Sequence, residues 1–580
     1  MKGSKIIEQV SARQLMETVS WLTNRTPYRL AGSNDELKAA QYIDRRLSEY
    51  GLDSRILEFY AYNSIPRESE LEILTDGVGV VASLPCAHIR STPPEGRELE
   101  MVFVGAGGYQ EYEGMDVRGK AVLVEVSYAP PVPEKARIAF EKGAVAIVCM
   151  NWGNDEGVIC NRGLKGVWGN PTEKSFSGIP DIIGIGITRT DGLKLKEKCR
   201  EDGCVSVRIK AFSDRLWSKV RQPFAVLKGN GASDEILLVC SHLDAWSPGV
   251  TCNATGNATT VEIARVLAEH RGELARDVYF VFWSGHEIAE AAGSTWFLDN
   301  FWHILNRKCV AYIHIDSTGV SGTEIFEIKA SPELRSFAED TYARFEKQGR
   351  IRSMNLKKIG DQSFMGIGIP SVTQRYSFTD HDIARANGAT LGWWNHTCED
   401  GIDKCSLEIL QKDTQVTLQL IHSLATEEKL PYRIGDVFRD IQARLERIEK
   451  DYSDVVDLSA LRDVYEKSRR ALEEIVGRAE SCSELECGRY NGFLMKIARV
   501  LSPVIQTFAG KYEQDSYGNE SLGFPIPLLK DLPRLKMAEE GTLLHGMLET
   551  QLRRNLNQLV DAFEDVSYLA GLFQRAFLEQ

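Results

Sequence analysis

The sequence lacks several features that would place the protein in a specialised class. It has no run of about 18 apolar residues, so we expect no membrane-spanning helix. Basic residues are in the minority, 69 Lys and Arg against 82 Asp and Glu, and the net charge of −13 argues against nucleic acid or a membrane as a partner. The N-terminal stretch has no apolar signal-peptide core, and the 12 cysteines form no dense framework. We therefore expect reduced thiols and a cytoplasmic location.

The chain also lacks internal repeats, but its pattern changes along its length. At 580 residues it exceeds what one hydrophobic core accommodates. Residues 1–68 show two amphipathic helices and a strand, and residues 69–222 show short β-rich segments. Strands and helices alternate over 223–431, and helical spacing of apolar residues dominates 432–580. These four segments are the expected parts of the fold.

The segment 223–431 determines the expected fold class. Its strands, such as "EILLVC", "DVYFVFW" and "CVAYIHI", are almost continuously apolar, which is typical of strands buried on both faces. Because helices separate them, we predict an α/β fold with a mostly parallel sheet covered by helices. A β-rich domain is inserted before this sheet, and a helical domain follows it.

Imidazole and carboxylate side chains follow three of these strands. They are His242 with Asp244, His286 with Glu287, and His314 with Asp316. A single strand-end histidine is usually a satisfied core or surface residue, but three such pairs in succession are not explained in this way. The carboxyl ends of parallel strands gather functional groups, and this ligand set suits zinc in a site that activates water. Because residues i and i+2 lie on one side of a strand, we expect Asp244 to orient His242.

With these motifs, the chain resembles the zinc exopeptidase family of bacterial leucyl-type aminopeptidases, glutamate carboxypeptidase and the transferrin receptor. "TPYRLAGSNDELKAAQYI" is similar to the opening segment of that family. "VRGKAVLVEV" and "GIPDIIGIGITRTDGLKL" are similar to its inserted protease-associated domain. The helical C-terminal part lies where the carboxypeptidase and receptor branch has its dimerisation domain, so the resemblance implies a homodimer formed through residues 432–580.

The resemblance also implies roles for individual residues. His242 and Asp316 match ligands of the first metal, and Glu287 and His396 match ligands of the second. In "PGVTCNATGNA", Cys252 stands where the motif has an aspartate that bridges two zinc ions, and thiolate is itself a zinc ligand.

The residue before Glu287 departs from the motif as well. His286 stands where the family has its glutamate general base, and imidazole titrates near neutral pH. The implied cofactor is a divalent transition metal, zinc being expected, as one or two ions. The predicted catalytic group is His286, Glu287 and Asp244, and Asp361 in "GDQSF" matches a family acid without an assigned role.

A second alignment of this motif stays open at the level of sequence. The chain has one residue more than the family pattern between the acid pair and the following "GS". A shifted alignment makes Glu287 the base, with His286 and Glu290 as ligands one helical turn apart. We prefer the alignment anchored on the preceding strand.

The predicted function is a metal-dependent, aminopeptidase-like hydrolase of amide bonds that acts on a small peptide or an acylated amine. One alternative is a non-catalytic, receptor-like or scaffolding relative, which the changes at Cys252 and His286 favour. Retention of His242, Glu287, Asp316 and His396 argues against that alternative. The other alternative is a metal enzyme with changed chemistry that acts on a small non-peptide substrate.

Overall fold

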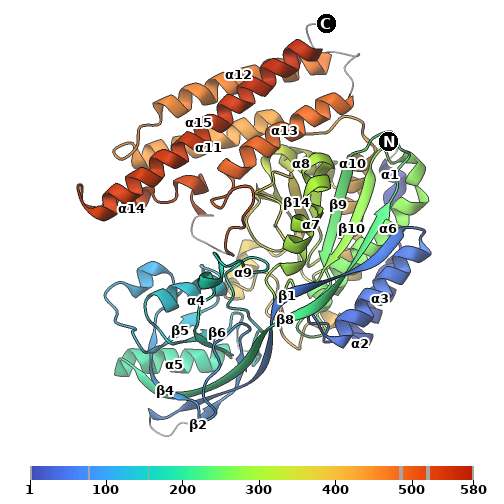
Figure 1. The fold of residues 1–580 in the computed structure, drawn as a ribbon. Coiled ribbons are helices and arrows are strands. Elements are labelled where there is room, and N and C mark those ends of the chain that lie inside the picture. Colours follow the sequence, from blue (N-terminus) through green and yellow to red (C-terminus); the bar gives the residue numbers. More distant parts are fainter. Residues whose placement is uncertain (1–2, 76–78, 155, 482–486, 518–522, 578–580) are drawn as a thin grey trace.

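The computed structural model describes residues 3–75, 79–154, 156–481, 487–517 and 523–577. Figure 1 shows three parts: an α/β domain that carries both the N-terminal and central segments, a smaller β-rich inserted domain, and a long helical domain in orange and red. Among the described residues, no helix is both long enough and apolar enough to cross a membrane.

The α/β domain is built on a mostly parallel sheet, which confirms the predicted fold class. Its strands follow the order β13-β12-β14-β11-β9-β10-β8, and only the β12/β14 and β10/β8 pairs in this row are antiparallel. The strands are β8 (Val205–Leu227), β9 (Ile236–His242), β10 (Asp277–Trp283), β11 (Cys309–His314), β12 (Ile325–Ala330), β13 (Ile351–Asn355) and β14 (Ser371–Ser377).

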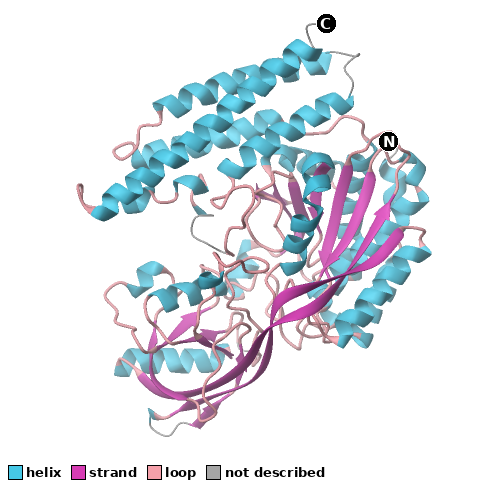
Figure 2. Ribbon diagram, in the orientation of Figure 1, coloured by secondary structure: helices cyan, strands magenta, loops and turns pink. Residues whose placement is uncertain are grey.

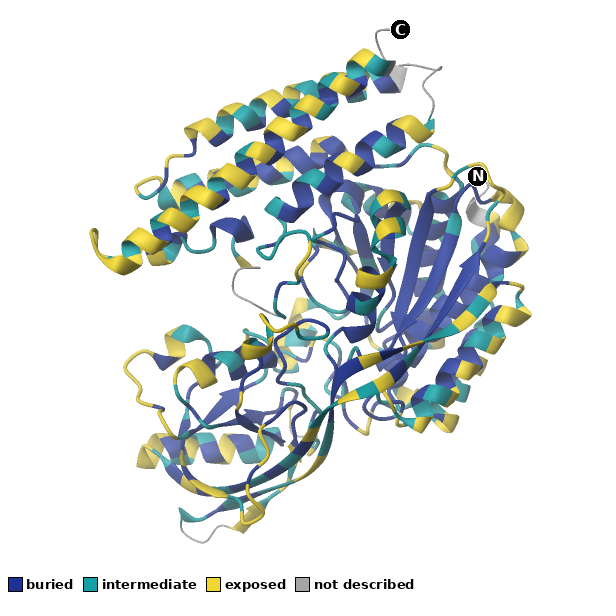
Figure 3. Cartoon of the chain, in the orientation of Figure 1, coloured by how far each residue is buried: buried dark blue, intermediate teal, exposed yellow. Residues whose placement is uncertain are grey.

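Both faces of this sheet are buried, which explains its continuously apolar strands. In β9, Leu237 and Val239 face one core, and Leu238 and Cys240 face the other. The first face packs against α2 (Ala12–Arg25), α3 (Asn34–Glu49), α6 (Thr255–Glu269), α8 (Pro332–Phe345) and α10 (Leu407–Thr426), and the second against α7 (Ala292–Lys308). Short α1 (Gly3–Ile7) and α9 (Asp380–Arg385) complete the domain. Figure 3 shows the sheet in dark blue between helices with exposed outer faces.

The inserted domain continues the same sheet through a two-stranded ribbon. Strand β1 (Asp53–Ile73) pairs antiparallel with nearly the whole of β8, and both run from one domain into the other (Figure 2). The predicted boundaries after residues 68 and 222 therefore fall inside strands. The remaining elements are β2 (Gly79–Val81), β3 (Ser83–Pro85), β4 (Arg97–Phe103), β5 (Ala121–Glu125), β6 (Ala146–Met150), β7 (Ile183–Ile187), α4 (Val132–Glu141) and α5 (Arg189–Asp202).

The helical domain packs directly on the α/β domain. Its helices are α11 (Ile434–Tyr452), α12 (Ser459–Ser481), α13 (Cys487–Ile505), α14 (Leu532–Met537) and α15 (Leu543–Phe577). The buried guanidinium of Arg499 on α13 donates hydrogen bonds to the carbonyls of Cys309, at 2.6 Å, and of Gly368. Because the apolar side chains of α11 and α13 join the core of the α/β domain, the two domains share one core.

Candidate metal centre

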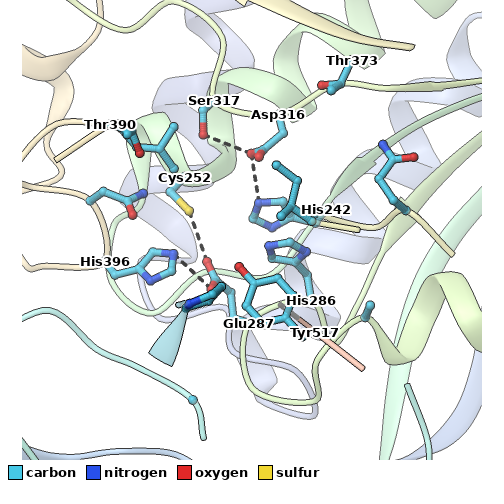
Figure 4. Close-up of a pocket in the computed structure, with 18 of the residues that line it drawn as sticks. His242, Cys252, His286, Glu287, Asp316, Ser317, Thr373, Thr390, His396 and Tyr517 are labelled. Atoms are coloured by element: carbon cyan, nitrogen blue, oxygen red, sulfur yellow. Dashed lines mark hydrogen bonds and ion pairs between the residues drawn. The ribbon is translucent and has the colours of Figure 1, made fainter. Parts of the chain in front are cut away.

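Except for Asp244, which lies behind them, the predicted site residues line one cavity where the three domains meet. This cavity has a volume of about 340 Å³. The inserted domain contributes Trp152 and Arg162 to its wall, the helical domain contributes Tyr517, and the α/β domain contributes the acids and imidazoles (Figure 4). A ligand in the cavity would therefore contact all three parts of the chain.

His242 is the last residue of β9, and Asp316 lies two residues beyond the end of the neighbouring strand β11. The His242 Nε2 atom lies 3.3 Å from Asp316 Oδ1. Burial would raise the pKa of Asp316, but His242 and Arg375 outweigh it and hold this pKa well below its usual value. Apart from this ion-pair contact with Asp316, the buried His242 Nε2 has no hydrogen-bond partner in the described part of the chain, so it could serve as a cation ligand once it is unprotonated.

Asp244 has a different task from the one predicted. The main-chain carbonyl of Asp244, not its carboxylate, lies 3.0 Å from His242 Nδ1. The carboxylate instead accepts hydrogen bonds from the backbone amides of His286, at 3.1 Å, and Glu287, at 3.0 Å. Asp244 therefore orients His242 through its backbone and fixes the turn that carries the next two site residues through its side chain.

Glu287 lies at the centre of the cluster. Its Oε1 accepts a hydrogen bond from the Cys252 thiol at 3.2 Å, and its Oε2 lies 3.2 Å from His396 Nε2. Trp246 Nε1 donates to the same Oε2 at 2.8 Å. Burial would raise the pKa of Glu287, but the imidazoles of His396, His286 and His242 together lower it. The carboxylate is therefore ionised at neutral pH, and its two oxygens contact the Cys252 thiol on one side and the His396 imidazole on the other.

Cys252 is presented by a short segment between β9 and α6. Asp400 holds this segment, because its carboxylate accepts the backbone amides of Thr251 and Cys252, each at 3.0 Å. Burial, together with the charges of Glu287 and Asp316, raises the pKa of the Cys252 thiol well above its usual value. A cation bound to the sulfur would have to displace the thiol proton, so its affinity would increase with pH.

His286 is anchored by a second carboxylate. Its Nδ1 lies 2.9 Å from Asp361 Oδ2, and Ser294 Oγ donates to the other oxygen of Asp361 at 3.0 Å. The His286 ring stacks on the His242 ring with centroids 3.9 Å apart. Burial would lower the pKa of His286, but Asp361, Glu287 and Asp244 outweigh it and raise this pKa well above its usual value.

The donor atoms fit a transition-metal ion. Two groups of three have their ligand atoms within 4.8 Å of one another: His242 with His286 and Glu287, and Cys252 with Glu287 and His396. Nitrogen, oxygen and sulfur donors of this kind are the ligands that zinc prefers. Glu287 belongs to both groups. Asp316, which pairs with His242, lies beside the first group.

The helical spacing that the shifted alignment assumes is wrong. Strand β10 ends at Trp283 and α7 begins at Ala292, so His286 and Glu290 lie in a turn and not one helical turn apart. Glu290 belongs to neither group of potential ligands. The turn accommodates the extra residue with positive φ angles at Glu290 (47°) and Ala291 (59°).

Three contributing residues were missed at the level of sequence. Trp246 follows Asp244 by two positions, so its proximity to the site was inferable from the motif "SHLDAW". Asp400 stands four residues after His396, but nothing in "NHTCED" shows that it holds the Cys252 segment. Tyr517 comes from the helical domain, and no local pattern places it in the cavity.

Comparisons with known proteins show what the chain is similar to. Residues 224–421 match the model of Peptidase family M28, and residues 95–195 match the PA domain. Aminopeptidase YwaD of Bacillus subtilis is 24% identical over 455 residues, which cover 74% of this chain and 90% of that protein. The match to the probable glutamate carboxypeptidase VP8 of Zea mays is 26% identical and covers 61% of this chain and 56% of that protein. Human transferrin receptor protein 2 is 23% identical, with coverage of 60% and 47%.

Solved structures show the same fold. A zinc aminopeptidase from Bacillus subtilis superposes with a TM-score of 0.57 at 20% identity, over 73% of this chain and 97% of that one. An aminopeptidase from Aneurinibacillus sp. strain AM-1 gives a TM-score of 0.55 at 21% identity, over 73% and 96%. The chain spans only about half the length of the maize and human relatives. Residues 224–421 therefore match Peptidase family M28, residues 95–195 match the PA domain, and the chain as a whole is similar to the zinc exopeptidases and their relatives, which include these aminopeptidases, glutamate carboxypeptidase and the transferrin receptor.

Proposed function

We propose that the protein is a metal-dependent hydrolase of amide or peptide bonds, aminopeptidase-like, with an atypical site in which Cys252 and His286 replace an aspartate and a glutamate. The observation that carries this proposal is the convergence of buried nitrogen, oxygen and sulfur donors around Glu287 beside a cavity. A catalytically useful metal site needs both donors and room for substrate.

In this proposal, one set of side chains binds the metal and another transfers protons. His242, Asp316, Glu287, His396 and Cys252 would hold one or two divalent ions, with zinc as the proposed metal. An ion held there supplies Lewis acidity at the scissile carbonyl. Asp361 holds Nδ1 of His286 and, with Glu287 and Asp244, favours the protonated ring in the cation-free chain. A cation bound beside the ring would lower this pKa by charge repulsion, and Nε2 would then accept a proton from the attacking water and return it to the leaving amine.

The proposed substrate is a small peptide or an acylated amine. The cavity volume of about 340 Å³ lies at the lower end of the range of small-molecule sites. Its walls combine Trp152 and Trp246 with charged side chains such as Arg375 and Lys329. Such a wall accommodates a compact substrate with both an apolar part and polar groups.

A second candidate function is a non-catalytic relative that binds a partner. The substitutions at Cys252 and His286 favour it, as does the similarity to transferrin receptors. The network around Glu287 opposes it, because binding to a partner elsewhere on the surface would not require buried donors that face an internal cavity.

The test measures metal content and hydrolysis together. We expect protein purified without chelator to contain about one or two equivalents of a transition metal per chain. We expect it to hydrolyse members of a panel of aminoacyl amides, and His286→Ala to reduce kcat by about 10²–10⁴-fold. His303→Ala, on the exposed face of α7, is the matched control and should keep full activity.

Two results would contradict the proposal. One is a metal content below about 0.2 equivalents that added zinc, cobalt, nickel or manganese does not restore, since a site of this donor set should bind at least one of them. The other is full metal occupancy with no hydrolysis of any panel member, which would support the non-catalytic candidate.

A further inference from the structure

The cavity contains a carboxylate that the proposed metal site does not use. Glu290 lines the cavity three residues after Glu287. Its oxygens make no hydrogen bond and no ion pair within the described part of the chain, and only longer-range charges act on them. By contrast, the neighbouring acid Glu327 is paired with Lys329 at 2.6 Å. Within the described part of the chain, Glu290 is therefore a half-buried acid that lines the cavity without a contacting partner.

The turn that carries Glu290 is held by the inserted domain. Gly169 N donates to the carbonyl of Glu290 at 2.6 Å, and Lys165 Nζ donates to the carbonyl of Ala289 at 2.7 Å. His88 Nε2 lies 2.6 Å from the carbonyl of Ile288. Because these contacts use the backbone, they fix the position of the turn but do not engage the carboxylate of Glu290.

The nearest cation does not neutralise Glu290 by contact. Lys165 directs its ammonium to two carbonyls, those of Gly169 at 2.6 Å and Ala289 at 2.7 Å. The Glu290 carboxylate instead lies against Gly163, where an added Cβ would be 3.6 Å from Oε2. Burial raises the pKa of Glu290, and the charge of Lys165 only partly opposes this. An additional cation in contact with the carboxylate would remove the cost of its burial.

We propose that Glu290 is a substrate-recognition residue whose carboxylate binds a protonated amine of the substrate. The inference rests on the proposed function, because it places the amine next to the turn that carries His286 and Glu287. An ammonium has three donors and fits a single unpaired carboxylate facing a cavity. The amine is either the free α-amine of a peptide or a side-chain amine, and both have the chemistry that Glu290 recognises.

Binding of simple probes tests this role without any hydrolysis. The full chain, as purified, is titrated by calorimetry with butylamine and with butan-1-ol, which differ in charge but hardly in size. We expect the wild type to prefer butylamine by about tenfold or more, since a desolvated ion pair contributes strongly to affinity. Glu290→Gln should abolish the preference, and Glu113→Gln, on the exposed surface of the inserted domain, should retain it.

Two outcomes would overturn the proposal. The first is an unchanged amine preference in Glu290→Gln. The second is loss of binding in Glu290→Ala with full retention in Glu290→Gln, because the carboxyl would then act as a neutral hydrogen-bonding group. Equal melting temperatures of the variants and the wild type exclude misfolding as the cause.

Hydrolysis assays separate this proposal from the proposed function and identify the source of the amine. Substrates are an alanyl amide with a free α-amine, its N-acetyl form, and an N-acetyl-lysyl amide. If Glu290 binds the α-amine, Glu290→Gln should raise KM only for the alanyl amide with a free α-amine. If Glu290 binds a side-chain amine, the same substitution should raise KM only for the N-acetyl-lysyl amide. Amine preference without hydrolysis contradicts only the proposed activity, and hydrolysis without amine preference contradicts only the role of Glu290.

Discussion

Asp244 offers a direct test of how the site is held together. Its buried carboxylate accepts the backbone amides of His286 at 3.1 Å and Glu287 at 3.0 Å. In Asp244→Ala both amides lose their acceptor, and in Asp244→Asn the remaining carbonyl oxygen can satisfy one of them. An unsatisfied buried donor costs about 1–3 kcal/mol, so we expect a local cost of about 2–6 kcal/mol for Ala and about 1–3 kcal/mol for Asn.

The measurement is hydrogen exchange of a peptide that covers residues 284–291. A cost of about 1.4 kcal/mol corresponds to a tenfold change in an opening equilibrium, so exchange in Asp244→Ala should be faster by tenfold or more. Zinc affinity, measured by chelator competition, should fall by about 10–100-fold, because such supporting contacts orient metal ligands.

A matched control lies at the far end of β10, the strand that leads into the turn of residues 284–291. Asp277, at the start of β10, also accepts a backbone amide, that of Gly229 at 3.0 Å. Asp277→Asn should leave both the 284–291 exchange and the zinc affinity unchanged. Unaltered exchange and unaltered zinc affinity in Asp244→Ala would refute the reasoning, since the carboxylate would then not hold the turn.

Two further predictions concern Cys252 as a proposed zinc ligand and the assembly of the chain. Cys252→Ser should lower zinc affinity about tenfold or more, because a hydroxyl is a far poorer zinc ligand than a thiolate. Bound metal should also protect Cys252 from alkylation while exposed Cys398 reacts throughout. Unchanged metal content in the serine variant, with alkylation indifferent to metal, would eliminate the thiolate role. If the helical domain forms a homodimer through α15, Tyr568→Glu with Leu572→Glu should yield monomers in sedimentation, because these exposed side chains, 63% and 40% accessible, lie one turn apart. A wild type that is monomeric at micromolar concentration would contradict the dimer.

The strand pattern made much of the α/β domain predictable. Apolar runs buried on both faces specify a covered, mostly parallel sheet, and the residues just beyond β9, β10 and β11 had to meet at one edge. Position alone therefore placed His242, Glu287 and Asp316 near one another, and the family resemblance selected them as metal ligands. The family resemblance contributed Cys252 and His396, which no periodicity places in the site.

What the sequence could not supply are contacts set by packing between distant segments. The pairing of Asp400 with the Cys252 segment spans 148 residues, and local propensity carries no information on it. Asp244 shows that strand geometry also leaves atomic contacts undetermined. It places this residue beside His242 but does not decide whether the backbone or the side chain of Asp244 makes the contact. The path of the turn through Glu290 depends on an inserted-domain loop that only the folded chain brings there.

The ribbon of β1 and β8 has a consequence for how the cavity can open. The inserted domain is joined to the α/β domain by two paired strands and not by a flexible linker. Rotation of one domain against the other must therefore twist this ribbon, and the bulge between Pro66 and Ser69 interrupts its regular pairing. Because twisting a paired ribbon strains its hydrogen bonds, we expect the ribbon to resist such rotation, and a change in the width of the cavity would require a change in strand twist.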